Sequence, residues 1–329
     1  MDVFKWGVIG PGKIAQAFVT DLPHAKSAIH TVHSVLSRHK DQASNFSELF
    51  QVPHALTDPD QFVEVDVDAV YIATPHVFHP EQVALCLEHQ IPVLCEKPIT
   101  INEKQLLHLL ELSVQYNTFL LEGMWIRFLP SMEKLLSLVA SGVIGEIVAI
   151  EAGVSFIAEY DPSNRFYNPA LGGGSLLDLG IYPVFLSTLL LGKPAKINAE
   201  GILSDTGVDS KCSAMFTYSG GQTASIESSL ITNKDGVATI FGEKGLIRIM
   251  HPWYEKPAGL EIESHDGTKI FHRCEWPGKG LYFEVDAMHD CIKRGVTESP
   301  YYCHHFSLDI MEIMDEMRRQ MRVVYPAYD

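Results

Sequence analysis

The first motif in this chain that could do chemistry is GPGKIA at residues 10–15. It places Gly10, Gly12 and Ala15 in a G-x-G-x-x-A frame between a predicted strand and a predicted helix. The first glycine permits a tight turn, and the second lets a pyrophosphate approach the backbone. The small third residue lets helix and strand pack closely. This context favours a dinucleotide site over a mere tight turn.

The second motif is CEKPIT at residues 95–100, which follows a predicted strand. Ligands of an open α/β sheet bind at the carboxyl edge of its strands, where Lys97 would lie. An ammonium there could polarise a carbonyl group or lower the pKa of a neighbour. Taken alone, Glu-Lys-Pro is more often an exposed turn.

The third motif is GGGSLLDLGIYP at residues 172–183. A helix capped by Ser175 would carry Asp178 and Tyr182 four residues apart on one face. Pro183 would either kink this helix or mark a later start. Beside a lysine, the Tyr182 phenol could exchange a proton with a substrate hydroxyl. A core tyrosine bonded to Asp178 fits these residues equally well.

The fourth motif is SRHK at residues 37–40, at the end of the second predicted strand. NAD sites normally carry an acid here, but no acid lies between Leu22 and Lys40. A hydroxyl at Ser37 and a guanidinium at Arg38 suit a 2′-phosphate. We therefore predict NADP(H), with NAD(H) as a weaker alternative; an ordinary solvated loop is the competing interpretation.

Two predicted domains must position these motifs. In residues 1–123, short apolar strands alternate with amphipathic helices, which predicts a Rossmann domain with a doubly wound parallel sheet. Its strands are expected at 4–9, 29–37, 68–74 and 92–96, and its helices at 13–21, 80–89 and 102–116. Residues 124–329 are predicted to form an α+β domain with a large, mostly antiparallel open sheet of six or more strands. The alternating segments begin at 147, 211, 222, 236, 245 and 268, with helices at about 175–191, 281–294 and 304–322.

The charge and the cysteine content of the chain exclude several classes of binding partner. The net charge is −16, from 25 Lys+Arg against 41 Asp+Glu, so a nucleic-acid backbone or an anionic membrane surface would be repelled. No stretch approaches the ~20 apolar residues of a membrane helix, and Asp2 near the start argues against a signal peptide. Six scattered cysteines form no C-x-x-C, which indicates reduced thiols and a cytoplasmic location. No H-E-x-x-H or Cys/His cluster is present, so no metal site is predicted.

Taken in order, the motifs resemble the Gfo/Idh/MocA family of oxidoreductases. Besides the first three motifs, the resemblance rests on IATPHVFH (72–79), GMWIRFLP (123–130) and FGEKGLIRI (241–249). Most members carry His where this chain has Tyr182. A tyrosine there is typical of the branch that contains dimeric dihydrodiol dehydrogenase and NADP-dependent D-xylose 1-dehydrogenase.

The resemblance implies a role for each matching residue. Lys97, Tyr182 and Asp178 would be catalytic, and Trp125, Phe156, Asp178 and Tyr182 would contact the substrate. The cofactor would contact Gly10, Gly12, Lys13, Ile14, Ala15, Ser37, Arg38, Thr74, Pro75, His76, His79, Glu96, Lys97, Trp125 and Arg127.

The function expected from this resemblance is hydride transfer between NADP(H) and a secondary alcohol or ketone. The substrate would be a small sugar or cyclic vicinal diol, and the chain would form a homodimer through the sheet of its second half. Two alternatives stay open on the sequence. One is a sensor that binds the dinucleotide without turnover, and the other is a relative of NAD-dependent glycosidases.

Overall fold

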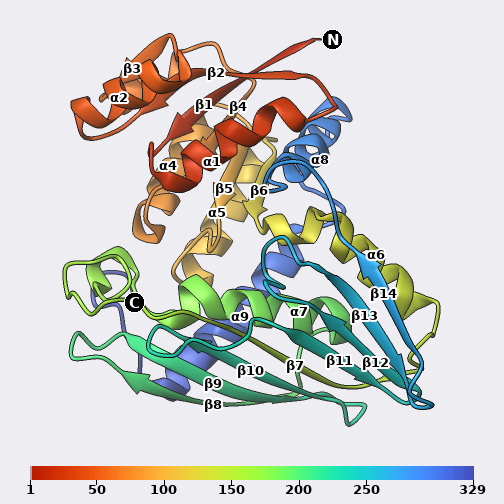
Figure 1. The fold of residues 1–329 in the computed structure, drawn as a ribbon. Coiled ribbons are helices and arrows are strands. Elements are labelled where there is room, and N and C mark those ends of the chain that lie inside the picture. The colour runs from red at the N-terminus through yellow and green to blue at the C-terminus, as the bar shows by residue number, and fades with distance from the viewer. Residues whose placement is uncertain (1) are drawn as a thin grey trace. The chain divides into compact units, whose positions relative to one another are not determined.

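The structure is a computed structural model that describes residues 2–329, and its contacts divide the chain into two compact units. Figure 1 shows the elements of both units. The first unit contains the residues up to Thr100, Lys104–Leu129 and Trp276–Ser307, and the second contains Ile101–Glu103, Pro130–Glu275 and Leu308–Asp329. Although it lies late in the sequence, the segment Trp276–Ser307 packs with the N-terminal residues and is therefore part of the first unit. A functional domain boundary between residues 123 and 124 stays a prediction.

The first unit contains a six-stranded parallel sheet of order β3-β2-β1-β4-β5-β6. Its strands are β1 (Val3–Ile9), β2 (Ile29–Leu36), β3 (His54–Leu56), β4 (Ala69–Ile72), β5 (Val93–Glu96) and β6 (Leu120–Gly123). Its helices are α1 (Lys13–Asp21), α2 (Lys40–Phe50), α3 (Pro59–Val63), α4 (His79–Glu88), α5 (Glu103–Gln115) and α8 (Tyr282–Lys293), with the short turns η1 (Leu22–His24), η2 (His76–Phe78) and η3 (Trp125–Phe128). The predicted doubly wound parallel sheet is confirmed.

The central strands of this sheet are buried on both faces. Every residue of β4, β5 and β6 is buried, as expected for parallel strands covered by helices on both sides. The strand order reverses between β1 and β4, because β2 lies on one side of β1 and β4 on the other. Ligands of doubly wound sheets bind where this reversal occurs, at the carboxyl ends of the strands.

The second unit contains an eight-stranded sheet of order β14-β13-β12-β11-β7-β10-β9-β8. All neighbours pair antiparallel except β7 and β10, which are parallel. Its strands are β7 (Ile147–Ser155), β8 (Lys196–Leu203), β9 (Asp209–Thr217), β10 (Thr223–Ser229), β11 (Ala238–Gly242), β12 (Gly245–Ile249), β13 (Gly259–Ser264) and β14 (Lys269–Arg273). The other elements are α6 (Pro130–Ala140), η4 (Pro169–Leu171), η5 (Leu176–Gly180), α7 (Ile181–Leu191) and α9 (His304–Met321). The predicted mostly antiparallel open sheet is confirmed.

One face of this large sheet forms the core of the second unit. Figure 1 shows α7 and α9 lying along that face. Side chains directed toward the helices, such as Ile150, Phe216 and Ile240, are fully buried. Alternate residues, such as Met215, point to the opposite face and are exposed.

The segment Pro169–Leu191 corrects one expectation from the sequence. By length and composition alone it could span a membrane, so the expectation that no stretch approaches this length is wrong. However, 83% of its most apolar 18 residues are buried inside the structure. The physical reason is that α7 is the core helix of the second unit, with Val184, Phe185 and Leu186 fully buried.

Two buried histidines lie together near the first strand of the parallel sheet. His30 Nδ1 accepts a hydrogen bond of 3.0 Å from Trp6 Nε1, and the rings of His30 and His289 lie 5.7 Å apart. Burial, followed by repulsion from His289, lowers the pKa of His30 to about 4. Burial likewise lowers the pKa of His289. Both rings are therefore neutral at pH 7.

These histidines predict loss of stability in acid. The pKa of His30 is lower in the folded protein than the ordinary 6.5, so the unfolded chain binds its proton more readily. The stabilisation is present above pH 6.5 and is lost as the pH falls toward 4, by about 3 kcal/mol for His30. Thermal melts between pH 8 and 4 should show a smaller acid-induced fall in Tm for His30→Gln than for the wild type. Equal pH dependence in the two proteins would contradict this account.

Candidate functional site

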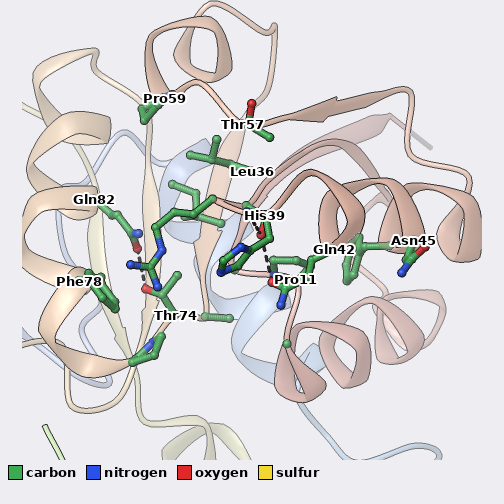
Figure 2. A pocket seen from close by; sticks show the side chains of 18 of the residues that line it. Pro11, Leu36, His39, Gln42, Asn45, Thr57, Pro59, Thr74, Phe78 and Gln82 are labelled. Atoms are coloured by element: carbon green, nitrogen blue, oxygen red, sulfur yellow. Dashed lines mark hydrogen bonds between the residues drawn. The ribbon is translucent and has the colours of Figure 1, made fainter. Parts of the chain in front are cut away.

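A pocket of about 700 Å³ opens in the first unit at the carboxyl ends of β1, β2 and β4. Figure 2 shows Thr74, Phe78 and Gln82 on one side of it, and Gln42 and Asn45 on the other. Six residues predicted to contact a cofactor line this pocket: Gly10, Gly12, Ser37, Arg38, Thr74 and Pro75. Its volume lies within the range of small-molecule and cofactor sites, about 300–1,000 Å³.

The glycines of the first motif have different roles. Gly10 has φ +88°, and an added Cβ would lie 2.6 Å from Thr74 Cγ2, so no other residue fits this turn. At Gly12 an added Cβ would meet only Ala73 O, at 4.0 Å. The protein therefore leaves the Gly12 backbone open toward the pocket, which fits the close approach of a dinucleotide pyrophosphate.

Arg38 packs over an aromatic ring in this pocket. Its guanidinium carbon is 4.3 Å from the centre of the Phe78 ring, and no carboxylate of residues 2–329 is paired with it. The neighbouring Ser37 hydroxyl donates to Gln42 Oε1 at 3.2 Å. Glu81 is the one acidic residue among the side chains that line the pocket. An unpaired guanidinium beside a hydroxyl is an arrangement suited to a phosphate.

Several lining residues have no motif in the sequence. They come from α2, α4, the start of α3 and the ends of β2 and β3: Leu36, Gln42, Asn45, Phe46, Leu49, Thr57, Pro59, Gln82 and Leu85. One of them orders the wall, because Thr74 Oγ1 donates a 2.6 Å hydrogen bond to Gln82 Oε1. Amphipathic helices show which face is buried, but not which polar residues flank a ligand.

The other predicted cofactor residues lie outside the lining of this pocket: Lys13, Ile14, Ala15, His76, His79, Glu96, Lys97, Trp125 and Arg127. Ala15 is fully buried, as its packing role in the motif requires. Arg127 is buried and donates to Tyr301 O through Nε at 2.9 Å. Contacts of these nine residues with a cofactor stay predictions.

His79 joins two of the motif segments. Its Nδ1 lies 2.9 Å from Pro98 O, and its Nε2 lies 2.8 Å from Thr74 O. Burial lowers its pKa to about 4, so the ring is neutral at pH 7 and donates to one carbonyl at a time. Because both nitrogens face backbone carbonyls, His79 ties the segment after β4 to the segment after β5.

Two buried carboxyl groups lie near Lys97: Glu96, its neighbour in the sequence, and Glu122, from the next strand of the sheet. The adjacent Glu96 accepts a 2.5 Å hydrogen bond from Tyr71 OH. Glu122, at the end of β6, is fully buried and lies close enough to Lys97 for the ammonium to favour its ionised form. No motif of the sequence analysis assigned a role to Glu122. The only signal was its position directly before GMWIRFLP.

In the second unit, Asp178 and Tyr182 stand on consecutive helical segments. Asp178 lies in η5, a π-helical turn, and Tyr182 in the first turn of α7. The Asp178 carboxylate is paired with Arg165, at 3.2 Å from Nη1 and 3.3 Å from Nη2. The Tyr182 ring lies 5.7 Å from that of Tyr254. The sequence analysis did not find Arg165 or Tyr254, because both lie in loops without a motif.

Phe156 lies beside the same loop. Its ring is 5.2 Å from that of Phe166, over which the Arg165 guanidinium carbon lies at 4.1 Å. An aromatic surface next to a paired carboxylate suits the apolar face and hydroxyl groups of a sugar or cyclic diol. The substrate contact predicted for Phe156 stays a prediction.

The helical segment that carries Asp178 and Tyr182 does not begin as expected from the sequence. Ser175 does not cap it; its hydroxyl instead donates to Asp209 Oδ2 at 2.6 Å. Asp209, from β9, also accepts from Leu176 N at 2.8 Å and so satisfies the first helical turn. Burial raises the pKa of Asp209 to about 6. Pro183 falls in the first turn of α7, where a missing N–H is tolerated, so the later start is the correct alternative.

Comparisons with known proteins agree with this architecture. A profile described as "Oxidoreductase family, NAD-binding Rossmann fold" matches residues 4–123, and one described as "GFO/IDH/MocA C-terminal domain" matches residues 132–248. Trans-1,2-dihydrobenzene-1,2-diol dehydrogenase of Mus musculus is 32% identical over 337 residues, covering 98% of this chain and 98% of the relative. The enzyme of that name from Xenopus tropicalis is 31% identical over 330 residues, covering 98% and 99%.

Solved structures show the same fold over the whole length. KijD10, a 3-ketoreductase from Actinomadura kijaniata solved with NADP and TDP-benzene, is 25% identical with a TM-score of 0.85, covering 97% of this chain and 98% of that one. An aldose-aldose oxidoreductase from Caulobacter crescentus is 21% identical with a TM-score of 0.87 and covers 98% of each chain.

The chain belongs to the Gfo/Idh/MocA family of oxidoreductases. The comparisons confirm the expected family, the oxidoreductase activity on a CH–OH group of a sugar or diol, and NADP(H) as cofactor. They do not favour the sensor or glycosidase alternatives. Among residues 2–329, no three potential His, Cys, Asp or Glu ligands are grouped for a metal ion.

The pocket geometry predicts how Arg38 acts on cofactor choice. A hydrogen bond to a charged group contributes roughly 1.5–3 kcal/mol, so Arg38→Ala should weaken NADPH binding by about 10- to 150-fold. NADH binding should hardly change, because NADH lacks the 2′-phosphate. Ser37→Asp should reverse the preference, since a carboxylate repels the phosphate and accepts both ribose hydroxyls.

The measurement is a pair of dissociation constants for NADPH and NADH in each protein. Lys40→Ala removes a positive charge from the same loop, but Lys40 does not line the pocket, so it is the matched control. If Arg38→Ala lost equal affinity for both cofactors, or if the wild type preferred NADH, this loop would not recognise the 2′-phosphate.

Proposed function

We propose that this enzyme interconverts a secondary alcohol and a ketone of a small sugar or cyclic vicinal diol, with Lys97, Tyr182 and Asp178 as its catalytic residues. NADP(H), held along the pocket lined by Gly12 and Arg38, takes or gives the hydride. The observation that carries the proposal is the unpaired Arg38 beside an open glycine turn, in a chain of the Gfo/Idh/MocA family.

Proton transfer is assigned to this chain's own side chains. Tyr182 takes the proton from the substrate hydroxyl during oxidation and returns it during reduction, and Lys97 assists by favouring the phenolate. Asp178 orients Tyr182 or the substrate hydroxyl, and its pairing with Arg165 supports this role because the ion pair holds the carboxylate in place. The names of the relatives, dihydrobenzenediol dehydrogenase and 3-ketoreductase, support the choice of substrate class.

Removing the acid–base groups should abolish most of the activity. Lys97→Met and Tyr182→Phe should each lower turnover by at least ~100-fold, the range expected for lost acid–base and electrostatic assistance. NADPH should still bind to both, because the backbone at Gly10–Gly12 holds the pyrophosphate. The assay follows NADP⁺ reduction by aldoses, cyclitols and dihydrodiols, and NADPH oxidation by keto-sugars.

Matched controls separate chemistry from damage to the fold. Lys104→Met and Tyr116→Phe make the same chemical changes outside the motifs and should retain full turnover. Near-normal turnover in Lys97→Met would make that lysine structural and refute the mechanism. Undiminished activity in Tyr182→Phe would move proton transfer to another group.

We also propose a homodimer built through the exposed face of the eight-stranded sheet. That face carries Met215, 43% exposed, and Phe271, 52% exposed, together with the ion pairs of Arg248 with Glu261 and Glu263. A sheet face that combines apolar side chains with fixed charges suits a self-complementary interface.

The oligomeric state tests this interface. Light scattering should give twice the mass of the chain, and Met215→Glu should shift it to the monomer because a charge would be buried at the contact. Leu107→Glu, at an exposed position on α5, is the control and should remain dimeric. A monomeric wild type, or a Met215→Glu protein that stays dimeric, would exclude this face.

We propose a cytoplasmic location and small-molecule partners only. Six free cysteines, four of them buried, support a reducing compartment. The net charge of −16 argues against nucleic acid and anionic membranes as partners. Cell fractionation tests the location, and recovery in a secreted fraction would contradict it.

A further inference from the structure

Glu122 is a buried carboxyl group of the first unit whose two oxygens both accept hydrogen bonds. Its Oε1 accepts a 3.0 Å hydrogen bond from Ile99 N, and its Oε2 accepts a 3.0 Å hydrogen bond from Tyr302 OH. Ser307 Oγ donates to the same Oε2. Three donors from segments far apart in the chain therefore converge on one buried side chain, which is a costly arrangement to retain without a purpose.

One of these donors belongs to the Glu-Lys-Pro segment. Ile99 follows Lys97 by two residues, so the bond from Ile99 N fixes the backbone that carries the lysine. From the other side, His79 contacts Pro98 O at 2.9 Å. The segment that presents Lys97 is thus held by β6 through Glu122 and by α4 through His79.

A negative charge on Glu122 would be balanced by the positive charge of Lys97. Burial raises the pKa of its carboxyl group, while hydrogen bonds from Ser307, Ile99 and Tyr302 and the positive charge of Lys97 oppose this rise. Cys95 pairs with Glu122 across β5 and β6, and burial, followed by the charges of Glu96 and Glu122, raises the pKa of its thiol. His79 faces Lys97 from α4 and is neutral. Among these groups, Lys97 carries the one positive charge that can balance an ionised Glu122.

We propose that Glu122 is a positioning residue that sets both the place and the charge of Lys97. Its hydrogen bond to Ile99 N holds the lysine segment, and its negative charge favours the ammonium form of Lys97 on which proton transfer depends. This inference rests on the catalytic role proposed for Lys97.

The test uses Glu122→Gln, which keeps the shape and the acceptor for Ile99 N but removes the charge. We expect kcat at neutral pH to fall by about 10-fold, with the KM for NADPH unchanged. The alkaline limb of the kcat–pH profile should move to lower pH by at least about one unit, because the ammonium loses an opposing charge. A normal kcat with an unshifted limb overturns the proposal.

Glu284→Gln is the matched control. Glu284 is also a fully buried glutamate of the first unit, and burial followed by repulsion from Glu96 raises its pKa well above the ordinary value. Since its surroundings disfavour the charged form, the neutral amide should leave kcat and its pH profile unchanged. A shift equal to that of Glu122→Gln would trace the effect to any buried glutamate and overturn the assignment.

A double-mutant cycle separates positioning from general stability. If Glu122 acts through Lys97, adding Glu122→Gln to Lys97→Met should cause no further loss of kcat. Losses that multiply would show that Glu122 acts independently and would overturn this inference alone. A fully active Lys97→Met protein would overturn both the proposed mechanism and this inference.

If Glu122→Gln does not fold, a second variant can test the same proposal. Tyr302→Phe removes one donor to Glu122 Oε2 and so disfavours the ionised carboxylate. The alkaline limb should move in the same direction as in Glu122→Gln, but by less. An unshifted limb in a folded Tyr302→Phe protein would count against the proposal.

Discussion

The parallel register of β1, β4, β5 and β6 is the constraint on which the rest of this structure depends. Because these strands run side by side in one direction, the segments that follow them meet at one edge of the sheet. That edge gathers the turn at Gly10, the segment from Thr74 and the lysine at position 97. The strand interiors are apolar, so chemistry is concentrated where the strands end.

The polar groups buried beneath this edge are neutral or compensated. Tyr71 donates to Glu96, His79 faces two carbonyl oxygens, and Glu122 accepts three hydrogen bonds. Ionised groups inside a protein are expensive unless they are paired and fully bonded. The arrangement therefore leaves Lys97 as the residue whose charge the surrounding groups are built to accommodate.

Local patterns were enough to predict much of the fold. The helix expected at 13–21 matches α1, and the strand expected at 4–9 lies within β1, because strand burial and the G-x-G-x-x-A turn are encoded in adjacent residues. The loop at Ser37 and Arg38 was found because an acid was missing where NAD sites carry one. Both residues line the pocket.

What could not be predicted depends on partners distant in the chain. The first turn of the helix at Ser175 is bonded by Asp209, 34 residues away from Ser175, so a local capping rule chose the wrong group. Glu122 meets Tyr302 across 180 residues, and no spacing rule reports such a contact. The π-helical turn at Leu176–Gly180 likewise arises from packing, since Gly180 lies close against Ser228 of β10.

Direct hydride transfer is the central claim, and isotope transfer tests it most directly. The enzyme would be incubated with NADP⁺ and a panel of aldoses and trans-dihydrodiols deuterated at the carbinol carbon, and the recovered cofactor would be analysed by mass spectrometry. We predict that at least one substrate delivers its deuterium to the nicotinamide ring, giving labelled NADPH and the matching carbonyl product. Tight binding of NADPH with no labelled cofactor from any member of the panel would contradict the account and identify a binding protein instead.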